Sequence, residues 1–295
     1  MSSPFVSGAQ PFERSDVETE VSRQGCQVDR FTMYSPSMDR DIKVVVVLPP
    51  AYAKEDKATF PILYTLHGYQ APYDTWAVMP KLHQQLQKTP FIYTCFDGDI
   101  ASFYIDSFYP VKTQRKQEIR ESDVPKTSKF MTFFFDEFIP AIDTWYRVNA
   151  DKRAVTGFSM GGCGAMTYGL AHPEMFSSIS GLSSTYMDFS DPKAKASEWM
   201  PDYLGSMDEF PERYEALDHY KLIDKHLASG VKLPPIYQHI GSEDFLVKQN
   251  RKFERFAQEK GIDVTYEETP GGHNWKFWHP ASVGVAEFHW THWQD

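Results

Sequence analysis

The sequence predicts an α/β fold with a mainly parallel central sheet flanked by helices. From residue 61 onward, short apolar runs alternate with segments of helical character, an alternation typical of α/β proteins. The runs are apolar at successive positions, which favours strands buried on both faces, as in a parallel sheet. No internal repeat, low-complexity tract or Pro/Gly/Ser-rich linker divides residues 1–295, so a single domain is expected.

The strands are predicted from aliphatic and aromatic runs that end at turn residues. Residues 1–20 are polar and are expected to form an irregular lead-in. Pro49 and Pro50 end the second strand, and His67-Gly68 ends the third. The expected strands are Val28–Tyr34, Ile42–Leu48, Pro61–Leu66, Phe91–Phe96, Arg153–Phe158, Ser178–Leu182, Ile236–Ile240 and Val264–Glu268.

The helices are predicted from apolar residues three or four positions apart, or from runs of small residues. They are expected at Ser128–Val148, Met160–Ala171, Lys248–Lys260 and Ala281–Trp293. Residues 185–233 are polar, charged and helix-prone, with little strand character. This segment predicts a helical insertion, which is either a cap over a functional site or a surface decoration.

Charge and composition exclude several classes of partner. Lys and Arg number 30 and Asp and Glu 40, and a net charge of −10 argues against nucleic acid or an anionic membrane as partner. The longest aliphatic run, Val44–Leu48, is far shorter than the ~20 residues of a membrane span. Three cysteines without a CxxC motif favour a reducing compartment, so a cytoplasmic location is expected, or a secreted one after removal of a leader. Homo-oligomerisation stays open.

The strongest local motif is Gly157-Phe158-Ser159-Met160-Gly161, a G-x-S-x-G sequence between a predicted strand and a predicted helix. This context is typical of a nucleophilic serine on a sharp turn, where flanking glycines let strand and helix approach closely. The serine oxygen would then lie at a helix N-terminus, which favours developing negative charge. Cys163, one turn into the helix, is expected to be a small core residue.

A nucleophilic serine needs a base and an acid that orients the base. His273 follows a predicted strand in the loop Pro270-Gly271-Gly272-His273, which can place an imidazole over the sheet edge. The acid is expected where the strand Ile236–Ile240 ends, and either Asp244 or its neighbour Glu243 could serve. His289 and His292 have a spacing that could hold a metal, but no acidic or Cys partner stands beside them, so no metal is expected.

Two backbone N–H groups should stabilise the oxyanion of such a reaction. One is expected from Met160, the residue after the serine. The other is expected from Tyr69, in the loop Leu66-His67-Gly68-Tyr69 that follows a predicted strand.

Five sequence blocks, in the same order, resemble the putative-esterase family. They are LYTLHGY at 63–69, DGDIASFYIDS at 97–107, GFSMGGCGAM at 157–166, GSEDFL at 241–246 and GGHNWKFW at 271–278. The family includes tributyrin-type esterases, feruloyl and acetyl-xylan esterases, S-formylglutathione hydrolases and mycolyltransferase-like enzymes. The resemblance runs from about residue 24 to 290 and implies the α/β-hydrolase fold.

The resemblance also assigns roles. It implies Ser159 as nucleophile, Asp244 rather than Glu243 as acid, His273 as base, and oxyanion donors at Tyr69 and Met160. The chain departs from the family pattern at the bulky Tyr69 and in the 185–233 insertion, so the substrate size is not implied. Aromatic and polar residues in or near the blocks are each expected either to line an acyl or alcohol pocket or to belong to the scaffold: Trp76, Phe103, Tyr104, Asp106 and Trp275.

The sequence therefore predicts a serine carboxylic-ester hydrolase that needs no cofactor. Short-chain or aromatic acyl esters are the expected substrates, including feruloyl or acetyl esters of carbohydrates. A thioesterase and an acyltransferase are alternatives that use the same residues. A catalytically silent binding protein is a different class, but it would usually have lost Ser159, Asp244 or His273, and all three are present.

Overall fold

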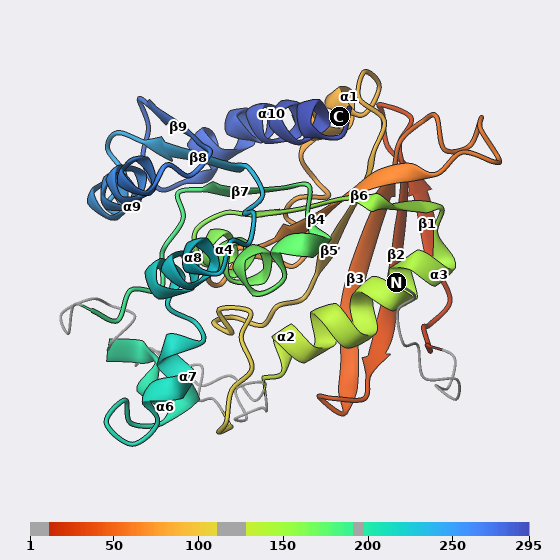
Figure 1. Cartoon of the computed structure of the whole chain (residues 1–295). Helices are drawn as coiled ribbons and strands as arrows, with labels where there is room; N and C mark the ends of the chain where they lie inside the picture. The colour runs from red at the N-terminus through yellow and green to blue at the C-terminus, as the bar shows by residue number, and fades with distance from the viewer. Residues whose placement is uncertain (1–11, 111–127, 191–197, 295) are drawn as a thin grey trace.

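A computed structural model describes residues 12–110, 128–190 and 198–294. Its centre is a nine-stranded sheet with the order β1-β2-β3-β5-β4-β6-β7-β8-β9 (Figure 1). The strands are β1 (Glu18–Val21), β2 (Gln27–Ser35), β3 (Arg40–Leu48), β4 (Phe60–Leu66), β5 (Ile92–Phe96), β6 (Val148–Gly157), β7 (Ser178–Leu182), β8 (Ile236–Gly241) and β9 (Val264–Thr269).

The sheet is mainly parallel, as predicted. The first strands pair antiparallel through β1-β2-β3-β5, and every later pair, from β5-β4 to β8-β9, is parallel. Strand β4 has β5 on one side and β6 on the other, so the chain reverses its direction of travel across the sheet at β4. Ligands of open α/β sheets bind at the carboxyl ends of the strands where the order reverses. The loops that follow β4 and β6 meet at that place.

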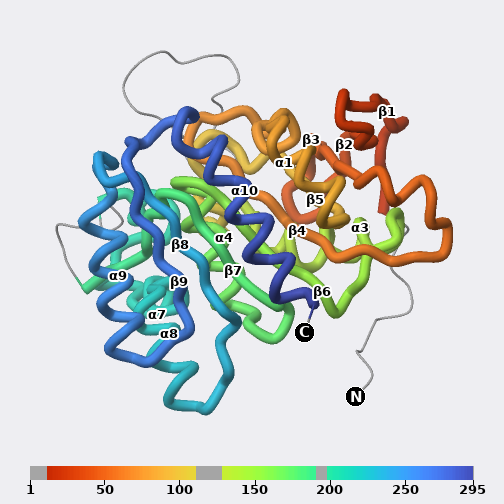
Figure 2. Tube along the Cα trace, turned by 90° about the horizontal axis from the view of Figure 1, so that it is seen from above, coloured from red at the N-terminus to blue at the C-terminus, as the bar shows by residue number. Residues whose placement is uncertain are grey.

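Helices cover both faces of the sheet, and each face has its own apolar core. On one face α10 (Trp275–His292) packs beside α1 (Pro80–Gln85), as Figures 1 and 2 show. On the other face lie α2 (Phe130–Thr132), the π-helical turn η1 (Phe133–Phe138), α3 (Ile139–Trp145), α4 (Met160–Ala171), α8 (His219–Ala228) and α9 (Val247–Lys260). Much of the aromatic content is buried in this second core, around Tyr64, Phe96 and Phe134.

Most predicted elements are confirmed, and α4 and β7 have the predicted bounds. The lead-in prediction is wrong at its end, because residues 18–21 form the edge strand β1. All four residues of β1 are exposed, so the strand forms through backbone hydrogen bonds to β2. Its sequence therefore has no apolar pattern from which a strand could be predicted. Residues 1–11 lie outside the described part of the chain. Helix α1 was not predicted either.

Helix α10 begins at Trp275, six residues before the predicted start at Ala281. The Asn274 side chain accepts a hydrogen bond from the Phe277 N–H and so caps the helix. Pro280 lies inside the helix, directly before the predicted start.

The insertion at 185–233 contains helices, as predicted: α6 (Pro201–Leu204), α7 (Pro211–Glu215) and α8. Residues 191–197 of this segment lie outside the described residues. Among the helices that the structure describes, none combines the length and apolar character required to cross a membrane.

Candidate active site

Ser159 stands on a strained turn between β6 and α4. Its backbone has φ 56° and ψ −118°, a conformation that costs a non-glycine residue about 1–3 kcal/mol. The flanking glycines make the turn possible. A Cβ on Gly157 would overlap the carbonyl of Gly161, and a Cβ on Gly161 would overlap the carbonyl oxygen of Leu66 at the end of β4. The serine oxygen is therefore presented at the carboxyl edge of the sheet.

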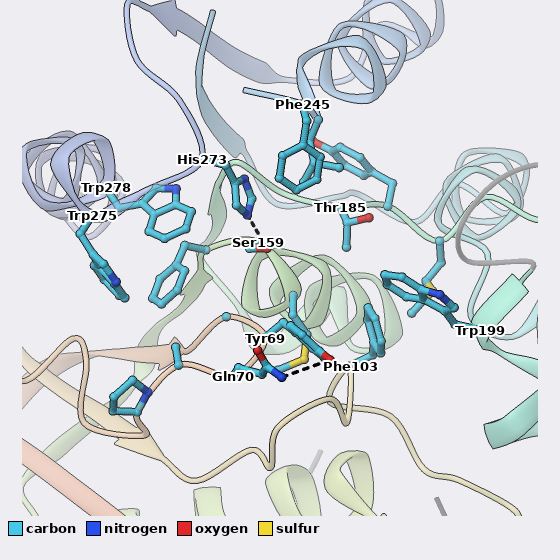
Figure 3. A pocket seen from close by; sticks show the side chains of 18 of the residues that line it. Tyr69, Gln70, Phe103, Ser159, Thr185, Trp199, Phe245, His273, Trp275 and Trp278 are labelled. Carbon is cyan, nitrogen blue, oxygen red and sulfur yellow. Dashed lines mark hydrogen bonds between the residues drawn. The ribbon is translucent and has the colours of Figure 1, made fainter. Parts of the chain in front are cut away.

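A hydrogen-bonded chain joins Ser159, His273 and Asp244 (Figure 3 draws the first link). The His273 Nε2 lies 2.9 Å from the Ser159 Oγ, and its Nδ1 lies 2.9 Å from the Asp244 Oδ2. A carboxylate can only accept, so Nδ1 carries the proton and Nε2 is left to accept from the serine hydroxyl. The arrangement can take a proton from Ser159 and return it to a leaving group.

The two candidate acids differ in burial. The Asp244 side chain is fully buried, and its Oδ1 accepts a hydrogen bond of 2.8 Å from the Leu246 N–H. Glu243 is exposed, and its backbone N–H donates to the Gly271 carbonyl. The geometry thus places Asp244, and not Glu243, against the imidazole, in agreement with what the family resemblance implies.

Aromatic rings enclose the His273 imidazole. The Phe245 ring centroid lies 4.5 Å away, and the Trp278 centroid lies 4.8 Å away with its plane nearly perpendicular. The Trp278 Nε1–H donates to the Ser183 Oγ at 3.0 Å, which fixes the indole. Low-polarity walls strengthen the Asp244–His273 interaction because less water screens it.

The two predicted oxyanion donors, Tyr69 and Met160, line the same cavity as Ser159. Met160 is the first residue of α4, where the helix dipole favours negative charge. Tyr69 lies in the loop after β4. Within the described residues, no protein acceptor pairs with either backbone N–H. Their role as oxyanion donors stays a prediction.

A cavity of about 400 Å³ opens over Ser159. Figure 3 shows Trp275 and Trp278 on one side of Ser159, with Thr185 and Trp199 on the other. Phe103, Tyr69 and Gln70 lie across the cavity from His273. The insertion contributes Thr185, Tyr186, Met187, Trp199 and Met200 to the lining. It therefore forms one wall of the site.

Of the predicted pocket residues, Phe103 and Trp275 line the cavity, and three others do not. Trp76 is fully buried against Phe158, and its Nε1–H donates to the Leu66 carbonyl. Tyr104 is fully buried beneath the β4 loop. The Asp106 carboxylate accepts from the N–H groups of Met131 and Thr132 at the start of α2. Each of these three side chains therefore supports the scaffold, which is one of the two alternatives that the sequence left open for it.

The sequence reasoning missed several residues that line the site. Phe245 and Trp278 stand in blocks that carry the resemblance, one residue after Asp244 and five after His273. Their nearness to these two residues was the available signal. Trp199 and Thr185 come from the insertion, where no periodic pattern distinguishes a lining residue from a surface one.

Two other histidines serve the scaffold. His239 is hydrogen-bonded by Tyr237 and Thr269, and buried His289 lies between Ser178 and Ser180. Across the described ranges, no three His, Cys, Asp or Glu side chains are grouped as a metal site would require. Cys163 is buried in the core, as predicted, and burial raises the pKa of its thiol to about 12.

Two buried histidines predict a loss of stability in acid. Burial lowers the pKa of His219 and of His289 to about 3, against about 6.5 in an unfolded chain. Their contribution to the free energy of unfolding is complete above pH 6.5 and is lost as the pH falls toward 3, because only the unfolded chain takes up the protons. We expect the urea midpoint to fall across this window, and to fall less steeply in His289→Gln. Equal slopes for the two proteins would contradict this assignment.

Comparisons with known proteins agree with this geometry. A family model described as putative esterase matches residues 35–284. An acetyl esterase of Caldicellulosiruptor saccharolyticus is 25% identical over 285 residues, which are 88% of this chain and 96% of the relative. An S-formylglutathione hydrolase structure from Agrobacterium tumefaciens has a TM-score of 0.77 at 17% identity, covering 94% of this chain and 99% of that one. A ferulic acid esterase structure has a TM-score of 0.70 at 22% identity, covering 91% and 98%. The likeness confirms the predicted fold class.

Proposed function

Because the chain belongs to the putative-esterase family and is a serine carboxylic-ester hydrolase, we propose that it cleaves short-chain or aromatic acyl esters through an acyl intermediate on Ser159. The observation that carries the proposal is the continuous hydrogen-bonded chain from buried Asp244 through His273 to Ser159, at the floor of an apolar cavity.

The first half of the reaction forms the acyl-enzyme. His273 Nε2 takes the hydroxyl proton while the Ser159 Oγ bonds to the acyl carbon, and the carbonyl oxygen becomes an oxyanion. The N–H groups of Tyr69 and Met160 bind that oxyanion. Asp244 stabilises the imidazolium through Nδ1–H. The oxyanion then collapses, the bond to the alcohol oxygen breaks, and His273 protonates that oxygen.

The second half releases the acid. A water molecule enters the place that the alcohol has left. The water oxygen bonds to the acyl carbon while His273 takes a proton from that water. The second oxyanion uses the same two N–H groups. Its collapse breaks the bond to Ser159 Oγ, which regains a proton from His273. The free acid then leaves, and Ser159 and His273 have returned to their starting protonation states.

The two sides of the cavity suggest which part of an ester each would hold. His273 must reach the leaving oxygen, so the alcohol portion lies toward Trp275 and Trp278. The acyl group then extends toward Phe103 and Trp199, whose ring centroids lie 5.7 Å apart. A volume of about 400 Å³ is near the lower end of small-ligand pockets, roughly 300–1,000 Å³. These walls favour a small or flat acyl group such as acetyl, butyryl or feruloyl.

The alcohol portion is proposed to be a sugar. Trp275 is 42% exposed and lines the cavity, and an indole ring suits the apolar face of a pyranose. Acetylated or feruloylated carbohydrates therefore belong in the first panel of substrates. The acetyl esterase relative supports the acetyl half of this proposal.

The proposal is tested with p-nitrophenyl acetate and butyrate. We expect wild-type turnover of both, and a fall in kcat by a factor of about 10⁴ or more in Ser159→Ala, because the variant lacks the oxygen that His273 activates. The control is the circular dichroism spectrum of the variant, which should be unchanged. Full activity of Ser159→Ala would refute the proposed nucleophile.

A further inference from the structure

Two loops interlock beneath the proposed oxyanion site. One is residues 67–70, which follow β4, and the other is residues 97–104, which follow β5. The Gly98 N–H donates to the His67 Nε2 at 2.9 Å, and the Gln70 N–H donates to the Ile100 carbonyl at 2.9 Å. The second loop thus holds the first from both ends of the short segment that contains Tyr69.

Tyr104 provides a third link. Its side chain is fully buried, and its hydroxyl donates to the His67 carbonyl oxygen at 3.0 Å. The ring lies directly against Gly98 and Gly164, where a Cβ would collide with it. Burial also holds the pKa of Tyr104 well above its ordinary value, so the phenol stays protonated and remains a donor. Close packing therefore fixes the position of the ring, and the hydroxyl donates to the His67 carbonyl.

The backbone conformation at this point is unusual. Phe103 and Tyr104 have φ of 51° and 60°, two successive non-glycine residues in the left-handed region. The Ser102 Oγ accepts from the Tyr104 N–H at 3.0 Å and donates to the Gly98 carbonyl, which holds the turn. This turn sends Phe103 into the cavity and Tyr104 under His67. Strain of this kind persists only where the surroundings enforce it.

The hydrogen bonds fix two consecutive peptide planes. The phenol of Tyr104 holds the plane that contains the His67 carbonyl. The His67 Nδ1 lies 2.9 Å from the Gly68 carbonyl oxygen, in the next plane. Because the Gly98 N–H already donates to Nε2, the neutral Nδ1–H tautomer is the one that fits both contacts. A trans peptide points its N–H away from its carbonyl, so fixing the Gly68 carbonyl also fixes the direction of the Tyr69 N–H.

We propose that Tyr104 is a positioning residue for the oxyanion hole. Its phenol locks the His67–Gly68 peptide, and the His67 imidazole holds the adjoining Gly68–Tyr69 peptide. The two contacts together pre-orient the Tyr69 N–H toward the oxyanion before substrate binds. The proposal rests on the proposed ester hydrolysis at Ser159. A preorganised donor stabilises the transition state more than the bound substrate, so the loss of the lock should lower kcat rather than raise KM.

The test variant is Tyr104→Phe, which removes the hydroxyl and keeps the ring. We expect kcat for p-nitrophenyl acetate to fall about tenfold with KM within about twofold, since a misaligned donor costs less than the roughly 10²-fold loss of an absent one. The second readout is inhibition by butylboronic acid, which adds to the serine as a tetrahedral anion. Its inhibition constant should rise by the same factor as kcat falls.

The matched control is Tyr168→Phe. Tyr168 is also fully buried in the same aromatic core, and its hydroxyl donates to the Phe130 carbonyl at 2.9 Å. Losing that hydrogen bond should lower the melting temperature about as much as Tyr104→Phe does. It should leave kcat and the inhibition constant of butylboronic acid unchanged. If Tyr104→Phe does not fold, Ser102→Ala replaces it, because this change removes the acceptor of the Tyr104 N–H. We expect kcat of Ser102→Ala to fall, and its inhibition constant for butylboronic acid to rise, by equal factors smaller than those of Tyr104→Phe.

The possible outcomes distinguish the role of Tyr104 from ester hydrolysis at Ser159, on which it rests. A wild-type protein that neither hydrolyses the ester nor binds the boronate overturns ester hydrolysis at Ser159, and the role of Tyr104 with it. An active wild type whose Tyr104→Phe variant keeps kcat and boronate affinity overturns the role of Tyr104 alone. An equal loss of kcat in Tyr168→Phe also overturns it, because the effect would then belong to the core in general.

Discussion

Asp244→Asn should lower kcat/KM for p-nitrophenyl acetate by about 10⁴-fold with little change in fold. The fully buried Asp244 carboxylate accepts from the His273 Nδ1–H and so leaves Nε2 free to accept the serine proton. An amide in its place can donate to Nδ1, which favours the tautomer whose Nε2 carries a proton and cannot act as a base. Steady-state kinetics near neutral pH measure the loss.

The neighbouring carboxylate provides the control. Glu243→Gln removes a charge one residue away, on an exposed side chain. We expect its kcat/KM to stay within about twofold of wild type, since exposed charges interact weakly across water. If Glu243→Gln lost as much activity as Asp244→Asn, the assignment of the acid would be wrong.

Gly161→Ala should destabilise the protein and disable the site together. The new Cβ would overlap the Leu66 carbonyl oxygen, so α4 and its first residue would have to move away from β4. Overpacking of this kind costs about 3 kcal/mol, which lowers the melting temperature of a chain of this size by roughly 6 °C. A shift of about 1 Å between Ser159 and the oxyanion donors would cost about 10²-fold in kcat.

Gly230→Ala is the comparison for this effect. Gly230 also lacks a side chain, but nothing lies within 4 Å of the position that its Cβ would take. Its φ of +73° makes alanine mildly unfavourable there, so a small fall in melting temperature with unchanged kcat is expected. Differential scanning fluorimetry and p-nitrophenyl acetate turnover compare the two variants. A Gly161→Ala protein as stable and as active as Gly230→Ala would contradict the close packing at the turn.

The sheet and the serine turn could be predicted because their physical requirements are local. A parallel strand that is buried on both faces must be mainly apolar, as Phe60–Leu66 is. The helix after Ser159 must have small residues in its first turn, such as Gly161, to pass close to β4. Strand β1 could not be found in this way, because its exposed residues contribute only backbone hydrogen bonds. The first turn of α10 was not predicted, because the helix continues through Pro280, a residue that usually interrupts a helix. The helix begins instead after the Asn274 cap.

The candidate site also has a part that could be predicted from local sequence and a part that could not. Ser159, His273 and Asp244 stand in short motifs at strand ends, so the topology alone brings them to one edge of the sheet. The cavity walls depend on which way each aromatic side chain turns. Trp76 and Trp275 are the same residue type, yet one is buried beneath Leu66 and the other borders the cavity. Phe103 and Tyr104 are adjacent, and only the strained turn sends one into the cavity and the other beneath it.

Ser159 is expected to carry the acyl group, and rapid acid quenching tests this role directly. Wild-type protein is mixed with excess p-nitrophenyl acetate, quenched within the first turnover, digested and analysed by peptide mass spectrometry. We expect a burst of up to one p-nitrophenol per protein and one acetyl group on the peptide that contains Ser159. His273→Ala should show neither at the same time point. Acetylation at a different residue in step with the burst, with Ser159 unmodified, would contradict the account.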